Sequence, residues 1–367
     1  MNRRDFFVST AAGAVLSASS FPLSAQPSPV RKRPRMKLGC QSGPASDQRL
    51  QFFARHSVKN ICGAPEGWDK TQGVPSMDEL LQLKERAAKW GISIDMLTPP
   101  FLASTHVDRT ERAAIMLGKS PERDRDIEDF QKLIRNCARA EITAIKYNMS
   151  ILGVLRTGRT PGRGGVGYST WRLREAKPRT PLTRAGPVTA DAYWERISYF
   201  LERVVPVANE YKIRLACHPH DPGVPPVAGY QGVDAVLGTV DGLKKFISIQ
   251  ESPYHGLNFC QGTVSEMLEN PSEEIFDVIR YFGSRKKIFN VHFRIIRGKR
   301  DDFIEVHPDE GDIDFVRAMM LYRELDYPYM LMPDHVPVHP DDPGGSQAFA
   351  FAYGYIRALI QAMEHVG

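Results

Sequence analysis

Four side chains able to bind a metal ion stand at regular intervals in the C-terminal half of the chain: His218, Cys260, His292 and Asp334. Each follows a short apolar run typical of a β-strand, and roughly 30–45 residues, about one strand plus one helix, separate each from the next. Two imidazoles, a thiolate and a carboxylate suit Mn²⁺, Fe²⁺, Co²⁺ or Zn²⁺ better than Mg²⁺, which prefers oxygen ligands. A five- or six-coordinate ion with four protein ligands keeps positions for substrate oxygens, which favours Mn²⁺ or Fe²⁺ over a closed structural zinc site.

Apolar runs of this kind alternate with helical segments along most of the chain. The predicted strands are Met36–Cys40, Val58–Cys62, Ile92–Leu97, Ile142–Tyr147, Ile213–Cys217, Gly256–Phe259, Lys287–His292 and Tyr329–Met332. Eight β-α units predict an α/β protein with a (β/α)8 TIM barrel. No glycine-rich phosphate turn follows the first strand, which disfavours a doubly wound open sheet. On a barrel the ends of strands five to eight are neighbours, so the four candidate ligands converge on one rim.

Amphipathic segments between these strands are the predicted helices. They are 47–56, 76 onward, 121–140, 191–211, 240–249, 272–282, 312–325 and 347–365. Ser76 followed by Glu79 predicts a capping box. Residues 155–190 show neither the helical nor the strand repeat of apolar residues, and they are rich in Arg, Gly and Pro. We expect this stretch to be a long insertion after the fourth strand, either a lid over an anionic substrate or a solvated surface. The catalytic domain is expected to span residues 36–367.

The N-terminal segment has the features of a targeting signal. Arg3 and Arg4, a weakly hydrophobic stretch and a Leu23-Ser24-Ala25 end predict a Tat-type signal peptide over residues 1–25, followed by a flexible linker over 26–35. A disordered cytosolic tail is the alternative. The protein is therefore expected to be periplasmic or otherwise exported, and cytoplasmic if the signal is not used.

Charge, hydropathy and cysteine content indicate which partners and which kinds of protein are not expected. The net charge of +5 arises within residues 1–36, and the rest of the chain is neutral, so a nucleic-acid partner is not expected. No stretch beyond the N-terminal segment is apolar over the length that a membrane span needs. Five cysteines have no framework spacing, and Cys40, Cys62 and Cys137 are predicted to be buried, reduced thiols.

The segments that carry the candidate ligands resemble motifs of the mannonate dehydratase family. The similar segments are His218-Pro-His-Asp-Pro222, Cys260-Gln-Gly262, His292-Phe-Arg294, Phe303-Ile-Glu305, Gly311-Asp-Ile-Asp314, Pro333-Asp-His335 and Tyr147-Asn148. The resemblance implies a xylose-isomerase-like TIM barrel that dehydrates D-mannonate to 2-keto-3-deoxy-D-gluconate with Mn²⁺ or Fe²⁺. It also implies a small sugar acid as substrate and a homo-oligomeric assembly.

Carried over to this chain, the resemblance makes His218, Cys260, His292 and Asp334 the metal ligands and His335 a catalytic acid or base. Dehydration removes the proton α to the carboxylate and expels the β-hydroxyl, and a histidine can move either proton near neutral pH. We expect Arg294 to hold the substrate carboxylate by a two-pronged hydrogen bond, or else to form a salt bridge with Glu305 or another acid. The substrate-binding candidates are Asn148, His220, Asp221, Arg294 and Glu305.

Three positions depart from the family pattern. His220 replaces an aspartate, Val336 follows the Pro-Asp-His segment where glycine is usual, and Pro343-Gly344-Gly345 lacks the tyrosine of the family's Pro-Gly-Tyr run. A tyrosine of the last helix, Tyr353 or Tyr355, could take that role only if the helix shifted. Alternative activities are therefore a xylose-isomerase-like sugar isomerase or epimerase, a sugar lyase, or a non-catalytic sugar-binding relative.

Overall fold

A computed structural model describes residues 33–68, 73–177, 181–224 and 229–366. The predicted signal peptide and most of the predicted linker lie outside these residues. Within the described part of the chain, no helix is both long and apolar enough to cross a membrane.

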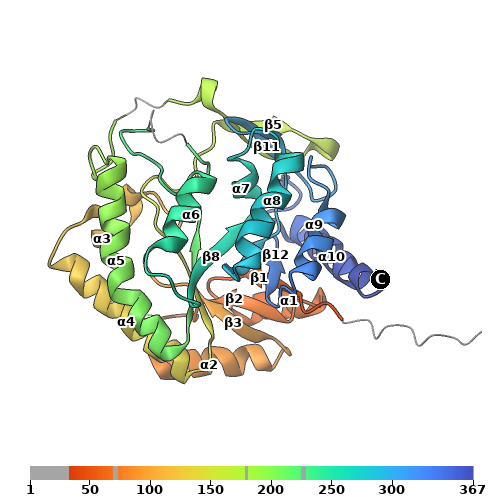
Figure 1. Cartoon of the computed structure of the whole chain (residues 1–367). Helices are drawn as coiled ribbons and strands as arrows, with labels where there is room; N and C mark the ends of the chain where they lie inside the picture. Colours follow the sequence, from red (N-terminus) through yellow and green to blue (C-terminus); the bar gives the residue numbers. More distant parts are fainter. Residues whose placement is uncertain (1–32, 69–72, 178–180, 225–228, 367) are drawn as a thin grey trace, which may run out of the picture. The chain divides into compact units, whose positions relative to one another are not determined.

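Eight parallel strands close into a barrel, as the sequence predicts (Figure 1). They are β1 (Lys37–Gln41), β2 (Asn60–Gly63), β3 (Ser93–Leu97), β4 (Ala144–Asn148), β7 (Arg214–His218), β8 (His255–Cys260), β9 (Ile288–His292) and β12 (Met330–Met332). Their order around the barrel is β1-β12-β9-β8-β7-β4-β3-β2. Every predicted strand is present with its ends within two residues of the prediction.

The barrel strands are apolar because both of their faces are covered. All residues of β4, β8 and β9 are buried. Side chains that point outward join the main core beneath the helices. A separate cluster fills the barrel interior and consists of Cys62, Met96, Ala144, Ala216, Phe289, Met330 and Met332. Cys40, Cys62 and Cys137 are buried free thiols, as predicted.

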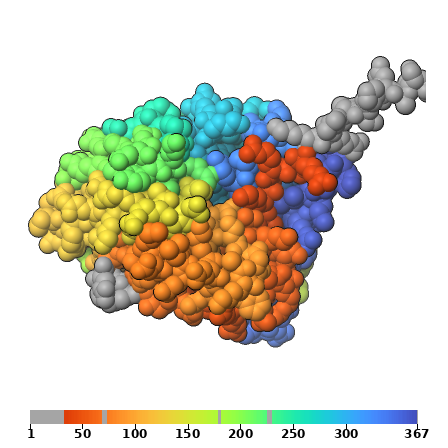
Figure 2. Space-filling model, turned by 90° about the horizontal axis from the view of Figure 1, so that it is seen from below, coloured from red at the N-terminus to blue at the C-terminus, as the bar shows by residue number. Residues whose placement is uncertain are grey.

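Helices surround the barrel (Figure 1), and in the space-filling view from below the colours of successive segments follow one another around the molecule (Figure 2). The helices are α1 (Asp47–Arg55), α2 (Met77–Ala88), α3 (Ala114–Leu117), α4 (Glu122–Arg139), α5 (Ala190–Tyr211), α6 (Val240–Ser248), α7 (Gln261–Ser265), α8 (Pro271–Ser284), α9 (Phe315–Glu324) and α10 (Ser346–Met363). The predicted capping box is present, because Ser76 and Glu79 bond each other's backbone N–H groups at the start of α2. Short 3-10 turns occupy Val107–Arg109, Arg163–Gly165 and Leu173–Glu175.

A second, four-stranded antiparallel sheet corrects the prediction for residues 155–190. Its order is β10 (Ile296–Lys299), β11 (Asp302–Glu305), β6 (Gly167–Arg172) and β5 (Gly158–Pro161). The insertion after β4 is therefore a hairpin that pairs with a second hairpin after β9, with Trp171 opposite Phe303. The sequence hides this sheet because β5 is largely exposed and its hairpin is completed by a segment far along the chain.

Candidate metal centre

The structure brings the four predicted ligands together at the C-terminal rim of the barrel. His218, Cys260 and His292 are the last residues of β7, β8 and β9, and Asp334 follows β12 by two residues. Cys260 and His292 are opposite each other across β8 and β9. Each residue offers one ligand atom, and these atoms all lie within 4.8 Å of one another. The prediction of convergence is confirmed by this geometry.

The arrangement of donor atoms fits a divalent cation. The Nδ1 atom of His292 is buried without a hydrogen-bond partner and lies 3.2 Å from Oδ2 of Asp334. The Nδ1 atom of His218 lies 2.7 Å from the carbonyl oxygen of Pro219, which can only accept, so this nitrogen carries the hydrogen. The Nε2 atom of His218 therefore presents its lone pair. A bound cation would satisfy these atoms and the carboxylate together.

Burial and local charges favour the metal-binding protonation states of three of the candidate ligands. Burial alone would raise the pKa of the Cys260 thiol, but the positive charge of the Arg294 guanidinium holds it below its ordinary value. Burial and the positive charge of Lys146 lower the pKa of His218 to about 4. Burial would also raise the pKa of Asp334, but His292 and His335 hold it well below its usual range. A thiolate, a neutral imidazole and a carboxylate are the forms that bind metals.

His335 lies between the ligand cluster and a second acidic group. Its Nδ1 atom is 2.8 Å from Oε1 of Glu305, and its Nε2 atom is 3.6 Å from Oδ2 of Asp334. Asp221, Glu305 and His335 also place one polar atom each within 4.8 Å of the others. Burial opposes protonation, but the charges of Asp334 and Glu305 outweigh it and raise the pKa of His335 to about 10. His335 thus lies beside a candidate ligand residue and holds a proton at neutral pH.

Arg294 forms the salt bridges that were the alternative to a substrate contact. Its guanidinium is buried, and Nη1 donates to Glu266 and Glu305, each at 2.7 Å. Its Nη2 donates to Oδ2 of Asp221 at 3.0 Å and to Thr263 at 2.9 Å. Both terminal nitrogens already have protein acceptors, so no two-pronged hydrogen bond to a substrate is available. Arg294 instead orients the acids and lies beside the Cys260 sulfur, 3.6 Å from Nη2.

Two residues of this charged cluster were missed by the sequence reasoning. Arg156 donates from Nη1 to Oδ1 of Asp221 at 2.6 Å and from Nη2 to Glu305. Glu266 follows α7 and is fully buried, and its Oε1 lies 3.6 Å from Nη2 of Arg156. The composition of residues 155–190 shows many arginines but not which one turns inward. No motif marks Glu266.

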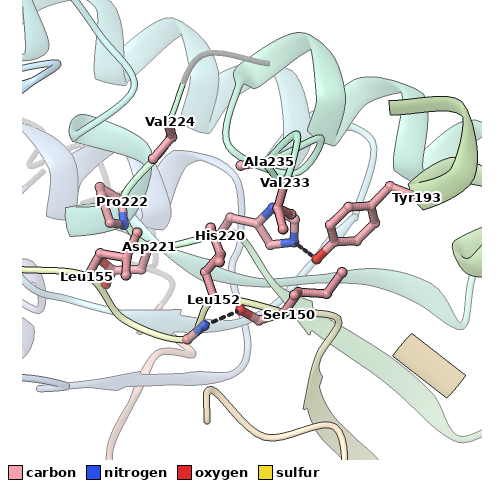
Figure 3. Close-up of a pocket in the computed structure, with 12 residues that line it drawn as sticks. Ser150, Leu152, Leu155, Tyr193, His220, Asp221, Pro222, Val224, Val233 and Ala235 are labelled. Atoms are coloured by element: carbon pink, nitrogen blue, oxygen red, sulfur yellow. Dashed lines mark hydrogen bonds between the residues drawn. The ribbon is translucent and has the colours of Figure 1, made fainter. Parts of the chain in front are cut away.

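His220, predicted to bind substrate, is a buried structural residue (Figure 3). Its Nε2 atom lies 2.7 Å from the carbonyl oxygen of Met149, and its Nδ1 accepts from the backbone N–H of Leu237 at 3.3 Å. The Tyr193 hydroxyl is 3.0 Å from the same Nε2 atom. Both ring nitrogens are engaged by the protein, which corrects the prediction. Its position two residues after a ligand suggested the site, but the loop turns its ring into the core.

The remaining predicted substrate-binding residues lie at the rim. Asn148 ends β4 opposite His218, and its side chain has no hydrogen bond to another described residue. Asp221 and Glu305 are buried and bonded to Arg156 and Arg294.

The tyrosines of α10 face other parts of the molecule. Tyr353 packs against Phe53 and Phe349, and Tyr355 lies against Phe315 and Phe351. Neither contact connects these rings to the ligand cluster. Gly344 and Gly345 precede the helix with φ of 88° and 74°.

Comparison with known proteins places this site in a family. The family model described as D-mannonate dehydratase (UxuA) matches residues 164–367, more than half of the chain. The chain belongs to this family. The mannonate dehydratase of Thermotoga maritima is 29% identical over 293 residues, which cover 70% of this chain and 77% of that protein. The mannonate dehydratase of Geobacillus thermodenitrificans is 29% identical over 296 residues, covering 71% and 75% of the two chains.

Solved structures agree on the barrel. The crystal structure of mannonate dehydratase from Streptococcus suis serotype 2 has a TM-score of 0.73 and 21% identity and covers 90% of this chain and 95% of that one. A D-psicose 3-epimerase has a TM-score of 0.56 and 15% identity and covers 89% and 99% of the two chains. At these identities the comparison shows a shared fold, and this UxuA-family member has the same TIM barrel.

Proposed function

We propose that the protein is a metal-dependent hydro-lyase that dehydrates D-mannonate, or a closely related aldonate, to 2-keto-3-deoxy-D-gluconate. The observation that carries the proposal is the cluster of His218, Cys260, His292 and Asp334 with His335 beside it, in a member of the mannonate dehydratase family. A catalytic acid or base next to a metal-binding cluster is what removal of an α-proton and loss of a β-hydroxyl require.

The four clustered residues would hold Mn²⁺ or Fe²⁺, because a mixed nitrogen, sulfur and oxygen set favours these ions over Mg²⁺. The ion would supply a Lewis acid that stabilises the negative charge developing on the substrate's carboxylate and α-carbon. Asn258 supports His292 from the interior, with its amide nitrogen 3.3 Å from Nε2 of the ring.

His335 is the proposed acid/base. In the overall reaction the proton leaves C2, and the C3 hydroxyl departs as water once it has received a proton. Glu305 accepts a hydrogen bond from Nδ1 of His335, which fixes the ring and directs Nε2 toward the side of Asp334. The ring holds a proton at neutral pH and can give it to the departing hydroxyl, and in its neutral form it can take the proton from C2. Arg156 and Arg294 hold Glu305 in place.

The test uses purified protein loaded with Mn²⁺ and D-mannonate, with formation of 2-keto-3-deoxygluconate as the readout. We expect product from the wild-type protein. We expect a loss of about 10²- to 10⁴-fold in kcat for His335→Asn, with metal content unchanged. His339→Asn is the matched control, because His339 lies in a half-buried turn of the same segment.

Two outcomes would count against the proposal. Absence of product from a metal-loaded wild-type protein would favour the isomerase, epimerase or other sugar-lyase alternatives. Full activity of His335→Asn would remove this residue from the proton transfers. If the wild-type and His335→Asn proteins bind sugars equally and neither turns them over, the protein is a sugar-binding relative.

We also propose that residues 1–25 direct export and that the enzyme works as a homo-oligomer. The export proposal is supported by the twin arginines and the apolar stretch that follows them. Cell fractionation of the full chain and of Arg3→Lys/Arg4→Lys tests it, and recovery of both only from the cytoplasm would contradict it. The oligomer proposal depends on the family resemblance and is tested by light scattering.

A further inference from the structure

Lys146 is a buried cation whose side chain belongs to the barrel interior. It lies two residues after Ala144 on β4, and Ala144 is part of the interior cluster. Side chains two apart on a strand share a face, so Lys146 and Asn148 face the interior as well. Lys146 is 6% exposed. The described residues include no acidic partner that forms an ion pair with it.

Other buried cations of the described residues are neutralised. Arg294 is paired with Asp221, Glu266 and Glu305. Lys287, at the opposite end of the barrel, binds Glu251 and the carbonyl oxygens of Ser252 and His255. The Nζ atom of Lys146, in contrast, donates to the neutral amide oxygen of Gln41 at 2.7 Å. A buried ammonium is costly unless an anion compensates it, so this one lacks its expected partner.

The ammonium group lies near the mouth of the barrel. Gln41 is the last residue of β1, is exposed, and lines a groove of about 600 Å³ between α1 and α10. Since Nζ of Lys146 bonds the Gln41 side chain, the charge reaches the level of the rim where the metal-ligand cluster is. Asn148, which follows Lys146 by two residues on β4, is opposite the candidate ligand His218. Lys146 thus lies between Gln41, which lines the groove, and the strand ends that carry the cluster.

We infer that Lys146 binds the carboxylate of an aldonate substrate and that Gln41 positions its ammonium group. The inference rests on the proposed function, which requires an anionic substrate, and it replaces the role first expected of Arg294. An ammonium is a compact point charge that accommodates a carboxylate without the planar match that arginine needs. Placed beside the carboxylate, it also stabilises the additional negative charge that forms when the C2 proton leaves.

The experiment compares Lys146→Met with Lys146→Arg and uses Lys287→Met as the control for removing a buried lysine. Calorimetry on Mn²⁺-loaded protein measures binding of D-mannonate, D-gluconate and D-mannitol, the last having hydroxyls but no carboxylate. We expect Lys146→Met to weaken binding of both aldonates by about 10- to 100-fold and to leave D-mannitol binding and metal content unchanged. Lys146→Arg should recover part of the affinity because it restores the charge.

If Lys146 only stabilised the fold, its removal would lower the unfolding temperature, and the inference predicts otherwise. We expect the metal-free Lys146→Met protein to unfold at the same temperature as the wild type or higher, because an uncompensated buried charge is gone. Lys287→Met should lower the unfolding temperature and leave aldonate affinity unchanged. Aldonate affinity of Lys146→Met within twofold of the wild type would overturn the inference. So would a wild-type protein that binds aldonates no better than D-mannitol.

The outcomes for Lys146 and for the proposed function are separable. If D-mannonate gives no keto product but aldonates bind in a Lys146-dependent way, the proposed reaction is contradicted and the carboxylate site is supported. If Lys146→Met forms the product with the KM and kcat of the wild type, the reaction is supported and the carboxylate site is contradicted.

Discussion

The Nδ1 atom of His292 lies 3.2 Å from Oδ2 of Asp334, yet no hydrogen bond satisfies this buried nitrogen. The two residues come from β9 and from the segment after β12, which are neighbours in the barrel. A buried ring nitrogen this close to a carboxylate is stabilised only when a proton or a cation lies between them. With Cys260 and His218 completing the cluster, a cation accounts for the arrangement.

His292→Ala should abolish high-affinity binding of Mn²⁺, because it removes one of four clustered donors. We expect saturating Mn²⁺ to stabilise the wild-type protein against unfolding by about 3 kcal/mol at 100 times the Kd. The variant should show no such stabilisation. Thermal unfolding with and without Mn²⁺, together with metal analysis, measures this effect. His339→Ala is the control, and an equal Mn²⁺ response in His292→Ala would exclude this residue as a ligand.

Cys260→Ser should change the kind of metal that the site retains. The serine hydroxyl keeps the size of the side chain and its contact with Thr263 but is a harder and much weaker acid than the thiol. In Co²⁺-loaded protein we expect the sulfur-to-metal charge-transfer absorption of the wild type to disappear. Cys217→Ser is the matched control, since Cys217 is a buried thiol on the neighbouring strand whose side chain joins the outer core. An unchanged spectrum for Cys260→Ser would show that this thiolate does not bind the metal.

Glu266 and Asp221 should respond differently to loss of charge although both contact Arg294. Burial and the nearby charge of Asp221 raise the pKa of Glu266, and its Oε2 has no partner, so we expect a neutral carboxyl there. Burial would also raise the pKa of Asp221, but Arg156 and Arg294 lower it to about 2, so it is ionised.

Glu266→Gln should therefore change the free energy of unfolding by less than about 1 kcal/mol, whereas Asp221→Asn should cost about 3 kcal/mol or more. Urea unfolding at pH 7 compares the two variants. Equal losses would indicate that Glu266 is ionised in the folded protein.

His255 should make the fold sensitive to mild acid. Its Nε2 atom donates to the carbonyl oxygen of Phe246 at 2.9 Å, and its buried Nδ1 has no acceptor for a second proton. Burial lowers the pKa of His255 from 6.5 to about 4. Between these two pH values, therefore, the unfolded chain binds a proton at this residue and the folded chain does not. This stabilisation is complete above pH 6.5 and is lost as the pH falls toward 4.

At pH 5 the loss attributable to His255 is about 2 kcal/mol relative to neutral pH. His255→Gln retains a donor for the Phe246 carbonyl and cannot titrate. The drop in unfolding free energy between pH 7 and pH 5 should be smaller in this variant than in the wild type by that amount. The same drop in both proteins would contradict the assignment, and His339→Gln should behave as the wild type.

The barrel and the ligand cluster could be predicted because their signals are local. A buried parallel strand is an apolar run, and a residue such as His218 or Cys260 at its end is placed on the rim by the topology alone. The second sheet could not be predicted in this way, because β6 meets β11 through a pairing of distant segments. Periodicity within one segment carries no information about such a partner.

The roles of individual charged residues were also beyond the sequence. Arg294 adjoins a ligand motif and was expected to contact substrate, but the acids that occupy it come from three other segments. His220 differs from His218 by two positions, yet the loop after β7 leads its ring to Met149 and Leu237. Lys146 stands in an ordinary strand, and its lack of an acidic partner is visible only in three dimensions.

Because the two hairpins pair with each other, one cannot be kept when the other is replaced. β5–β6 follows β4, and β10–β11 follows β9, so β7 and β8 lie between the barrel strands that carry them. A chimaera that kept one hairpin and exchanged the other for a short loop would leave β6 or β11 as a bare edge. Bare edges recruit other chains and lead to aggregation. Recombination or engineering of this barrel can therefore treat the two insertions only as one module.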